Sequence, residues 1–205
     1  FCVPILKSLY KNNYNIAVVY TQPPQKSHRG QKINKSPIQS TSENLNLEYR
    51  TPKTLEGNNE EHKFLRELNA DLAIVCAYGQ IIPKNFFNLT KKGFVNIHAS
   101  ILPSWRGAAP IQRSIMNLDP ETGISIMKIN EKLDSGPVSN IYKIKIDQNE
   151  NAQEISEKLS SLAAEKILDN VDDILADKAK FIDQDHSKAT YAKKILKEES
   201  QIDWD

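Results

Sequence analysis

The chain has 205 residues, enough for one domain, or for one domain and the start of another, to bury a hydrophobic core without disulfides or metal ions. Its 27 lysines and arginines balance 26 aspartates and glutamates, so the net charge of +1 argues neither for nor against a nucleic-acid partner. No run approaches the roughly 20 apolar residues that span a bilayer, and there is no signal-peptide pattern, so we expect a cytoplasmic protein without membrane contact.

The first half of the chain predicts alternating helices and strands. Apolar spacing and β-branched runs indicate helices over residues 4–10 and 59–68, and strands over 15–21, 47–50 and 71–78. The last of these strands is a nearly continuous apolar run closed by Gly79, which is typical of a parallel strand covered on both faces. We interpret Cys2 and Cys76, which have apolar neighbours, as core thiols rather than redox or catalytic groups.

Residues 22–37 are polar and basic, with Arg29 and Lys32 among five basic side chains, and we expect a surface loop. Taken alone, such a loop is most simply a solvated connection. The second half of the chain predicts further elements: short helices over 83–89 and 111–118, strands over 94–98, 123–130 and 141–146, a long helix over 152–175, and an extended exit over 180–185 and 189–195. This alternation implies an α/β fold with a twisted, mostly parallel sheet flanked by helices.

The most informative stretch is residues 94–112, which read F-V-N-I-H-A-S-I-L-P-S-W-R-G-A-A-P-I-Q. Asn96 and His98 alternate with apolar residues, so in a strand both side chains leave the same face. That pattern is wrong for a buried core strand. It places an amide and an imidazole at the C-terminal end of a strand, where open α/β sheets bind their ligands.

An amide that donates to an oxyanion and an imidazole that passes protons need a third group to orient the ring. We identify Asp134, in a Leu-Asp-Ser-Gly turn, as the best candidate. With no Ser or Cys in a nucleophile-elbow setting, Asn96, His98 and Asp134 suggest direct attack of one substrate on an acyl carbon of another. The alternative is structural: a hydrogen-bonded histidine, a strand-end asparagine and ordinary turn chemistry.

Other site classes find little support. No Cys/His cluster has zinc spacing, so we expect no metal, and neither phosphate-cradling nor dinucleotide-binding glycine motifs occur. For Trp105 and Arg106 two interpretations remain open. In the first interpretation, Trp105 packs against the domain and Arg106 pairs with a carboxylate. In the second, both side chains face a substrate.

The stretch over residues 94–112 closely resembles the signature of the folate-dependent formyltransferases, and its W-R-G-A-A-P-I-Q part resembles the members that act on initiator methionyl-tRNA. The similarity continues through T-Q-P near Thr21, A-Y-G-Q-I-I-P, E-T-G-I-S-I-M, L-D-S-G and the closing I-D-W. It covers essentially the whole chain. The resemblance implies the Rossmann-like formyltransferase fold, with 10-formyltetrahydrofolate as co-substrate and initiator methionyl-tRNA as acceptor.

Carried over by position, the resemblance makes Asn96, His98 and Asp134 the catalytic residues, which stabilise the tetrahedral intermediate of direct amine attack. It makes Ser100, Ile101, Leu102 and Pro103 the folate-contacting loop, and it assigns Arg29 and Lys32 to tRNA binding. The basic loop departs from the family's usual Asp-Arg-Pro-Ala-Gly-like run at four positions: Pro24, Gln25, Ser27 and His28.

The resemblance also sets expectations for domain organisation. It implies a catalytic domain over residues 1–188 that lacks the family's first strand, and a linker over 189–205 toward an absent C-terminal β-barrel domain. We expect a monomer. The rival enzyme hypotheses are a formyltransferase for a small amine, such as glycinamide ribonucleotide or an amino sugar, and a formyltetrahydrofolate hydrolase. A non-catalytic tRNA-binding or folate-binding module is the hypothesis of a different class.

Overall fold

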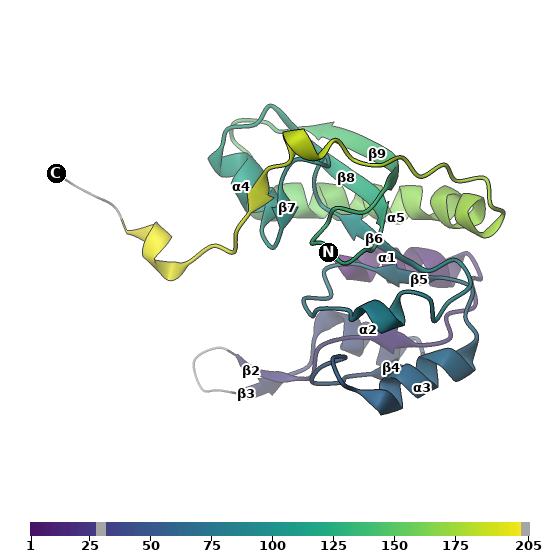
Figure 1. The fold of residues 1–205 in the computed structure, drawn as a ribbon. Coiled ribbons are helices and arrows are strands. Elements are labelled where there is room, and N and C mark those ends of the chain that lie inside the picture. Colours follow the sequence, from purple (N-terminus) through teal and green to yellow (C-terminus); the bar gives the residue numbers. More distant parts are fainter. Residues whose placement is uncertain (28–31, 202–205) are drawn as a thin grey trace.

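The computed structural model describes residues 1–27 and 32–201, and Figure 1 labels its elements. Helices flank sheets that contain both parallel and antiparallel strand pairs, so the expected α/β class is confirmed. Within the described residues, no helix combines the length and the apolar content that a bilayer crossing requires.

A four-stranded sheet forms the centre of the molecule, in the order β5 (Ala73–Val75), β6 (Phe94–His98), β8 (Glu121–Lys128) and β9 (Val138–Lys145). β5 and β6 are parallel, whereas β8 runs antiparallel to both β6 and β9. The turn over residues 129–137 is too short for the crossover that parallel strands require, so β9 must return antiparallel to β8. The functional candidates on β6 therefore lie on an interior strand.

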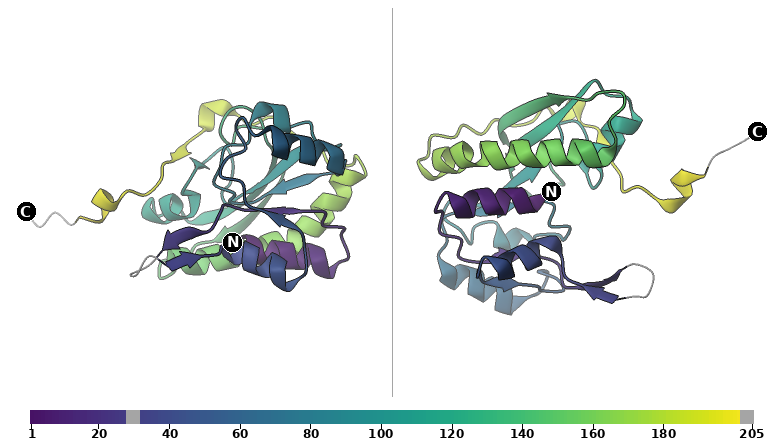
Figure 2. Two further views of the ribbon diagram at one scale, coloured as in Figure 1. Left: turned by 90° about the horizontal axis from the view of Figure 1, so that it is seen from below. Right: turned by 180° about the vertical axis from the view of Figure 1, so that it is seen from behind.

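The larger core lies between this sheet and two helices, α1 (Cys2–Lys11) and α5 (Ala152–Leu175), which Figure 2 shows side by side. α5 begins in a capping box, in which the Asn151 side chain accepts from the Glu154 amide and the Glu154 carboxylate accepts from the Asn151 amide. Its buried stripe has helical spacing: Ile155, Leu159, Ala163, Ile167, Val171 and Ile174.

Cys2 and Cys76 lie at one end of this core, between α1 and the residue that follows β5. The Cys2 thiol donates to the backbone carbonyl of Cys76 at 2.8 Å, and no disulfide joins the two. Both side chains are partly buried, which fits a packing role more closely than an exposed reactive one.

A second, two-stranded parallel sheet pairs β1 (Val19–Tyr20) with β4 (Tyr49–Arg50), beside α2 (Pro37–Asn44) and α3 (Asn59–Leu68). Its polar centre is Glu61, which is buried and accepts from the Tyr20 hydroxyl at 2.6 Å and from Nε of Arg50 at 2.7 Å. Burial, and then the neighbouring Glu61 carboxylate, raise the pKa of Tyr20 well above its usual value.

The basic segment expected as a surface loop contains two short antiparallel strands, β2 (Gln25–Ser27) and β3 (Lys32–Asn34), which project from the body of the molecule (Figure 1). The polar composition concealed this pairing. Residues 28–31, between the two strands, lie outside the described residues.

The remaining elements are short, and they precede or follow β6 and α5 in the chain. A 3₁₀ turn, η1 (Lys84–Phe86), precedes that strand, and β7 (Arg106–Gly107) and α4 (Pro110–Met116) follow it. After α5 the chain forms η2 (His186–Lys188), β10 (Tyr191–Ala192) and η3 (Lys197–Ser200). β10 pairs in parallel with β7, so part of the segment predicted as a linker over 189–205 packs on the domain. Residues 202–205 of that segment lie outside the described residues.

Candidate active site

The end of β6 carries two polar side chains on one face of the strand. Asn96 and His98 alternate with Val95 and Ile97, which are almost completely buried. His98 is itself buried, with 6% of its surface exposed, whereas Asn96 is partly exposed. Asn96 is paired with β5 on one side and β8 on the other, whereas His98 is paired with Ser125 of β8.

Asp134 reaches this pair from the turn over residues 129–137, where its backbone is left-handed with φ 46°. Its Oδ1 accepts a hydrogen bond of 3.4 Å from the Asn96 amide, and its Oδ2 lies 3.6 Å from Nδ1 of His98. The turn leaves β8 opposite Val95, at the end of the pairing remote from His98, and folds back across the strand. The structure thus brings together the three side chains that the sequence analysis identified as candidate catalytic residues.

Two residues outside the Asp134 turn, Gly107 and Gln184, hold it in place. The Gly107 amide donates to Oδ2 of Asp134 at 2.9 Å. Nε2 of Gln184 donates to the backbone carbonyls of Asp134, at 3.0 Å, and Gly136, at 2.7 Å. Sequence reasoning missed Gln184, because a single glutamine in an extended segment carries no spacing signal. Its side chain is buried and spans from this turn to Arg106.

The hydrogen bonds of His98 determine where its proton lies. Nε2 is 2.9 Å from the backbone oxygen of Trp105, and because a carbonyl only accepts, Nε2 carries the proton and donates. Nδ1 of the neutral ring therefore presents a lone pair toward Asp134. When the ring is protonated, Nδ1–H points at the carboxylate.

The predicted folate-contacting loop, residues 100–103, divides into inward and outward positions. Ser100 and Leu102 are buried, and the Ser100 hydroxyl donates to the Ser104 carbonyl at 2.6 Å. The buried Ser125 hydroxyl supports the loop, because it donates to the Ser100 carbonyl and accepts from the Leu102 amide. The positions that remain partly exposed are Ile101 and Pro103.

Arg106 is buried, with 3% of its surface exposed, and it does not pair with a carboxylate. Its Nε and Nη2 donate to Oε1 of Gln184, and Nη2 also donates to Nδ1 of His186 at 2.9 Å. Among the described residues, no carboxylate oxygen lies within 4.0 Å of the guanidinium. One of the two sequence interpretations of Arg106 is therefore wrong. Trp105 is partly exposed, and its indole N–H donates to Asp119 at 2.7 Å, which leaves both of its interpretations open.

The two predicted tRNA-binding residues belong to the basic segment over residues 22–37. Arg29 lies outside the described residues, and of Lys32 the structure describes only the backbone, in β3. As for metal ions, no group of three or more His, Cys, Asp or Glu side chains is placed to hold one in the part of the chain that the structure describes.

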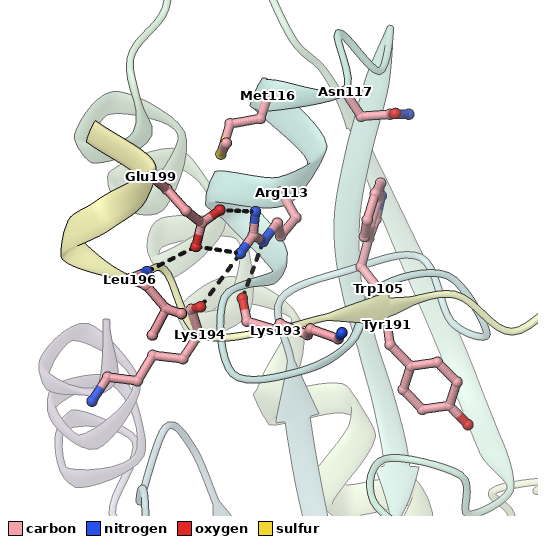
Figure 3. A pocket seen from close by; sticks show the side chains of 9 residues that line it. All are labelled: Trp105, Arg113, Met116, Asn117, Tyr191, Lys193, Lys194, Leu196 and Glu199. Atoms are coloured by element: carbon pink, nitrogen blue, oxygen red, sulfur yellow. Dashed lines mark hydrogen bonds and ion pairs between the residues drawn. The ribbon is translucent and has the colours of Figure 1, made fainter. Parts of the chain in front are cut away.

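A pocket of about 520 Å³ opens between α4 and the segment around β10 and η3 (Figure 3). Of its three basic lining residues, Arg113, Lys193 and Lys194, Arg113 is paired with Glu199, because Nη1 and Nη2 donate to the two carboxylate oxygens at 2.7 and 3.0 Å. The other lining residues are Trp105, Met116, Asn117, Tyr191 and Leu196.

Comparison with known proteins gives this geometry a context. A family model described as formyl transferase matches residues 1–171. A methionyl-tRNA formyltransferase of Pelagibacter ubique is 66% identical over 204 residues, which cover 100% of this chain and 66% of that relative, so the chain spans just under two thirds of the relative's length.

Solved structures of formyltransferases have the same fold. A phosphoribosylglycinamide formyltransferase from Anaplasma phagocytophilum superposes with a TM-score of 0.72 at 19% identity, covering 86% of this chain and 84% of its own. The sugar 3N-formyl transferase WlaRD, solved in the presence of dTDP and 5-N-formyl-THF, superposes with a TM-score of 0.68 at 19% identity, covering 93% of this chain and 65% of its own. This chain belongs to the formyl transferase family.

Proposed function

We propose that this protein transfers the formyl group of 10-formyltetrahydrofolate to the α-amine of initiator methionyl-tRNA, and so acts in translation initiation in the cytoplasm. The observation that carries the proposal is the 66% identity to a methionyl-tRNA formyltransferase, which extends over the whole of this chain. The convergence of Asn96, His98 and Asp134 supports the chemistry.

The proposed reaction begins when the neutral α-amine attacks the formyl carbon. The carbonyl oxygen becomes an oxyanion, the bond from the formyl carbon to N10 of the folate then breaks, and N10 takes up a proton while the amine loses one. The Asn96 amide has two N–H groups, of which one points at Asp134, so the other can donate to the oxyanion. Donors of this kind contribute roughly 3 kcal/mol each to transition-state stabilisation.

His98 and Asp134 would act as a pair in this scheme. The Nε2–H of His98, which the Trp105 carbonyl holds in the free protein, is the second donor to the oxyanion. Asp134 faces Nδ1, so its carboxylate keeps the ring oriented while charge develops on the oxyanion. With water, the same carboxylate can accept the proton that the attacking amine releases.

For the co-substrate we infer a position beside the loop over residues 100–103, where Ile101 and Pro103 are the partly exposed positions and the Ser125 hydroxyl holds the backbone. Ser100 and Leu102 would then act by shaping the loop rather than through their side chains. For the acceptor we infer that Arg29 and Lys32 bind tRNA phosphate or the terminal base pair. We expect a monomer.

The strongest rival is a formyltransferase for a small amine. The solved structures that share this fold include enzymes named for glycinamide ribonucleotide and for amino sugars, but they are 19% identical to this chain. A likeness of that degree extends to the fold alone. The much higher identity to a methionyl-tRNA formyltransferase favours the tRNA acceptor.

The decisive experiment measures formyl transfer from 10-formyltetrahydrofolate by the product of the complete reading frame that contains this chain. Charged initiator tRNA and glycinamide ribonucleotide are offered as competing acceptors, and Asp134→Asn is the inactive control. We expect formyl-methionyl-tRNA as the product. Preferential formylation of glycinamide ribonucleotide, or equal rates with Asp134→Asn, would contradict the proposal.

A further inference from the structure

A second pocket, of about 430 Å³, lies against the outer side of the Asp134 turn. Leu133 and Ser135, the neighbours of Asp134 in the chain, form part of its wall. Arg106 forms another part, and the residue after it, Gly107, donates to the Asp134 carboxylate. The pocket is therefore built in part from the two segments that hold the candidate catalytic carboxylate. Its full lining is Arg106, Lys132, Leu133, Ser135, His186 and Tyr191.

Among the residues that the structure describes, none supplies a counter-ion for the positive charge of Arg106. Its bonded partners, Gln184 and His186, accept through a neutral amide oxygen and a ring nitrogen. A buried charge without an opposite partner is expensive, so such a guanidinium is a strong site for an anion. Among the described residues, the Nη1 group has no hydrogen-bond partner, and it is not among the fully enclosed polar atoms without one, so it stays accessible from the pocket.

Two further donors face the same space. Because Nδ1 of His186 accepts from Arg106, the neutral ring carries its proton on Nε2, which has no partner among the described residues. The Lys132 ammonium likewise has no partner in the described part of the chain, and its side chain is exposed. Arg106, Lys132 and His186 thus offer hydrogen-bond donors around one pocket with no carboxylate to compete.

In the pocket of Figure 3, by contrast, the arginine has a carboxylate partner. There Glu199 neutralises Arg113 through two hydrogen bonds. Arg106, unlike Arg113, has no carboxylate partner among the described residues, so of these two arginines it is the one available to an external anion. Tyr191, which is 59% exposed, lines both pockets and offers an aromatic face beside the cationic groups.

We propose that Arg106, Lys132 and His186 form a subsite for the phosphodiester next to the 3′-terminal nucleotide of the acceptor, with Tyr191 stacking on a base. The inference rests on the proposed function. An aminoacyl ester is carried on the terminal ribose, so the adjacent phosphodiester must lie within one nucleotide of the reacting amine. Arginine, with its planar fork of donors, suits phosphate oxygens, and exposed aromatic rings suit nucleobases.

The test is a double-mutant cycle, in which one change is made in the protein and the other in that phosphodiester of the tRNA. Initiator methionyl-tRNA is compared with the same tRNA carrying an uncharged methylphosphonate at its last internucleotide linkage, using wild type and Lys132→Ala. We expect the substitution in the tRNA to lower kcat/KM of the wild type by about tenfold, as for loss of a charge-assisted hydrogen bond. In Lys132→Ala this penalty should shrink to about threefold or less, because the two changes remove one interaction.

Arg106→Lys is a second variant for the same cycle, since it keeps the charge but loses the planar fork. Lys178→Ala is the matched control, because Lys178 is an exposed lysine after α5 that lines neither pocket. An unchanged penalty in Lys132→Ala would overturn the subsite. A rise in KM for 10-formyltetrahydrofolate alone would also overturn it, and would assign the pocket to the folate carboxylates. Failure of the wild type to formylate unmodified methionyl-tRNA would instead reject the proposed function itself.

Discussion

Gly107 and His98 share one carboxylate oxygen: Oδ2 of Asp134 accepts from the Gly107 amide at 2.9 Å and lies 3.6 Å from Nδ1 of His98. The backbone of β7 therefore fixes the position of the group that faces the imidazole. The shorter of the two contacts is structural and the longer one is the contact that protonation of the ring would tighten. Oδ2 of Asp134 is therefore both held by the backbone and directed at the ring of His98.

His98→Ala and Asp134→Asn should each lower kcat strongly while leaving folate affinity nearly unchanged. Loss of a positioned acid–base group typically costs about 10²–10⁴ in rate, and neither side chain belongs to the loop over residues 100–103. Single-turnover formylation measures the rate, and fluorescence titration with a folate analogue measures binding. A variant that turns over like the wild type would remove that residue from the chemistry.

Gly107→Ala should destabilise the protein and slow the reaction together. A Cβ at this position would stand 2.8 Å from the Ala192 carbonyl, and the backbone φ of 119° is one that side chains rarely adopt. Gly57→Ala is the matched control, because Gly57 also has a positive φ, of 68°, but open space around it. Backbone strain alone costs about 1–3 kcal/mol.

Chemical denaturation should therefore show a larger loss of unfolding free energy for Gly107→Ala than for Gly57→Ala, with a fall in kcat only for the former. Equal effects of the two substitutions would mean that the contact with Ala192 is unimportant.

The stabilisation that Tyr14 contributes should be lost at strongly alkaline pH. Its hydroxyl donates to Asp172 at 2.5 Å, and burial, followed by this carboxylate, raises the pKa of Tyr14 to about 12. A raised pKa favours the neutral phenol in the folded state, so this stabilisation is complete below the ordinary value of 10.0 and is lost as the pH rises toward 12.

Denaturant unfolding followed at a series of pH values tests this effect. The stability of the wild type should fall more steeply between pH 10 and 12 than that of Tyr14→Phe, which lacks the titrating group. Parallel profiles for the two proteins would show that Tyr14 does not contribute.

Arg29→Ala should weaken tRNA binding and flatten its salt dependence. Each phosphate contact that is lost reduces the slope of log K against log salt by about one. Titrations of initiator tRNA at several salt concentrations give that slope, with Lys145→Ala, an exposed lysine at the end of β9, as the control. An unaltered slope would remove Arg29 from the proposed interface.

The elements with strong periodicity were predictable from the sequence. The helix over 152–175 and the strand over 94–98 match α5 and β6, because a long apolar stripe and strict alternation leave few alternatives. α2 was missed, since P-I-Q-S-T-S-E-N has too few apolar residues to show a helical face, although Ser36 caps it through a hydrogen bond to Gln39. Two-residue strands such as β7 and β10 carry no pattern at all.

The candidate site was foreseeable in part for the same reason. Asn96 and His98 stood out because polar residues rarely alternate on one face of a buried strand, and Asp134 because it lies in a Leu-Asp-Ser-Gly turn. The contacts that join them are long-range, and no local rule could supply Gln184 or the unpaired charge of Arg106. The antiparallel course of β8, which brings the Asp134 turn back across β6, likewise depends on the whole sheet.

The parallel pair β7–β10 connects a late part of the chain to the Asp134 turn. The Ala192 carbonyl accepts from the amides of Ala108 and Ala109, next to the glycine that holds Asp134. A displacement of β10 would therefore also move the backbone of β7, including the Gly107 amide that holds Oδ2 of Asp134.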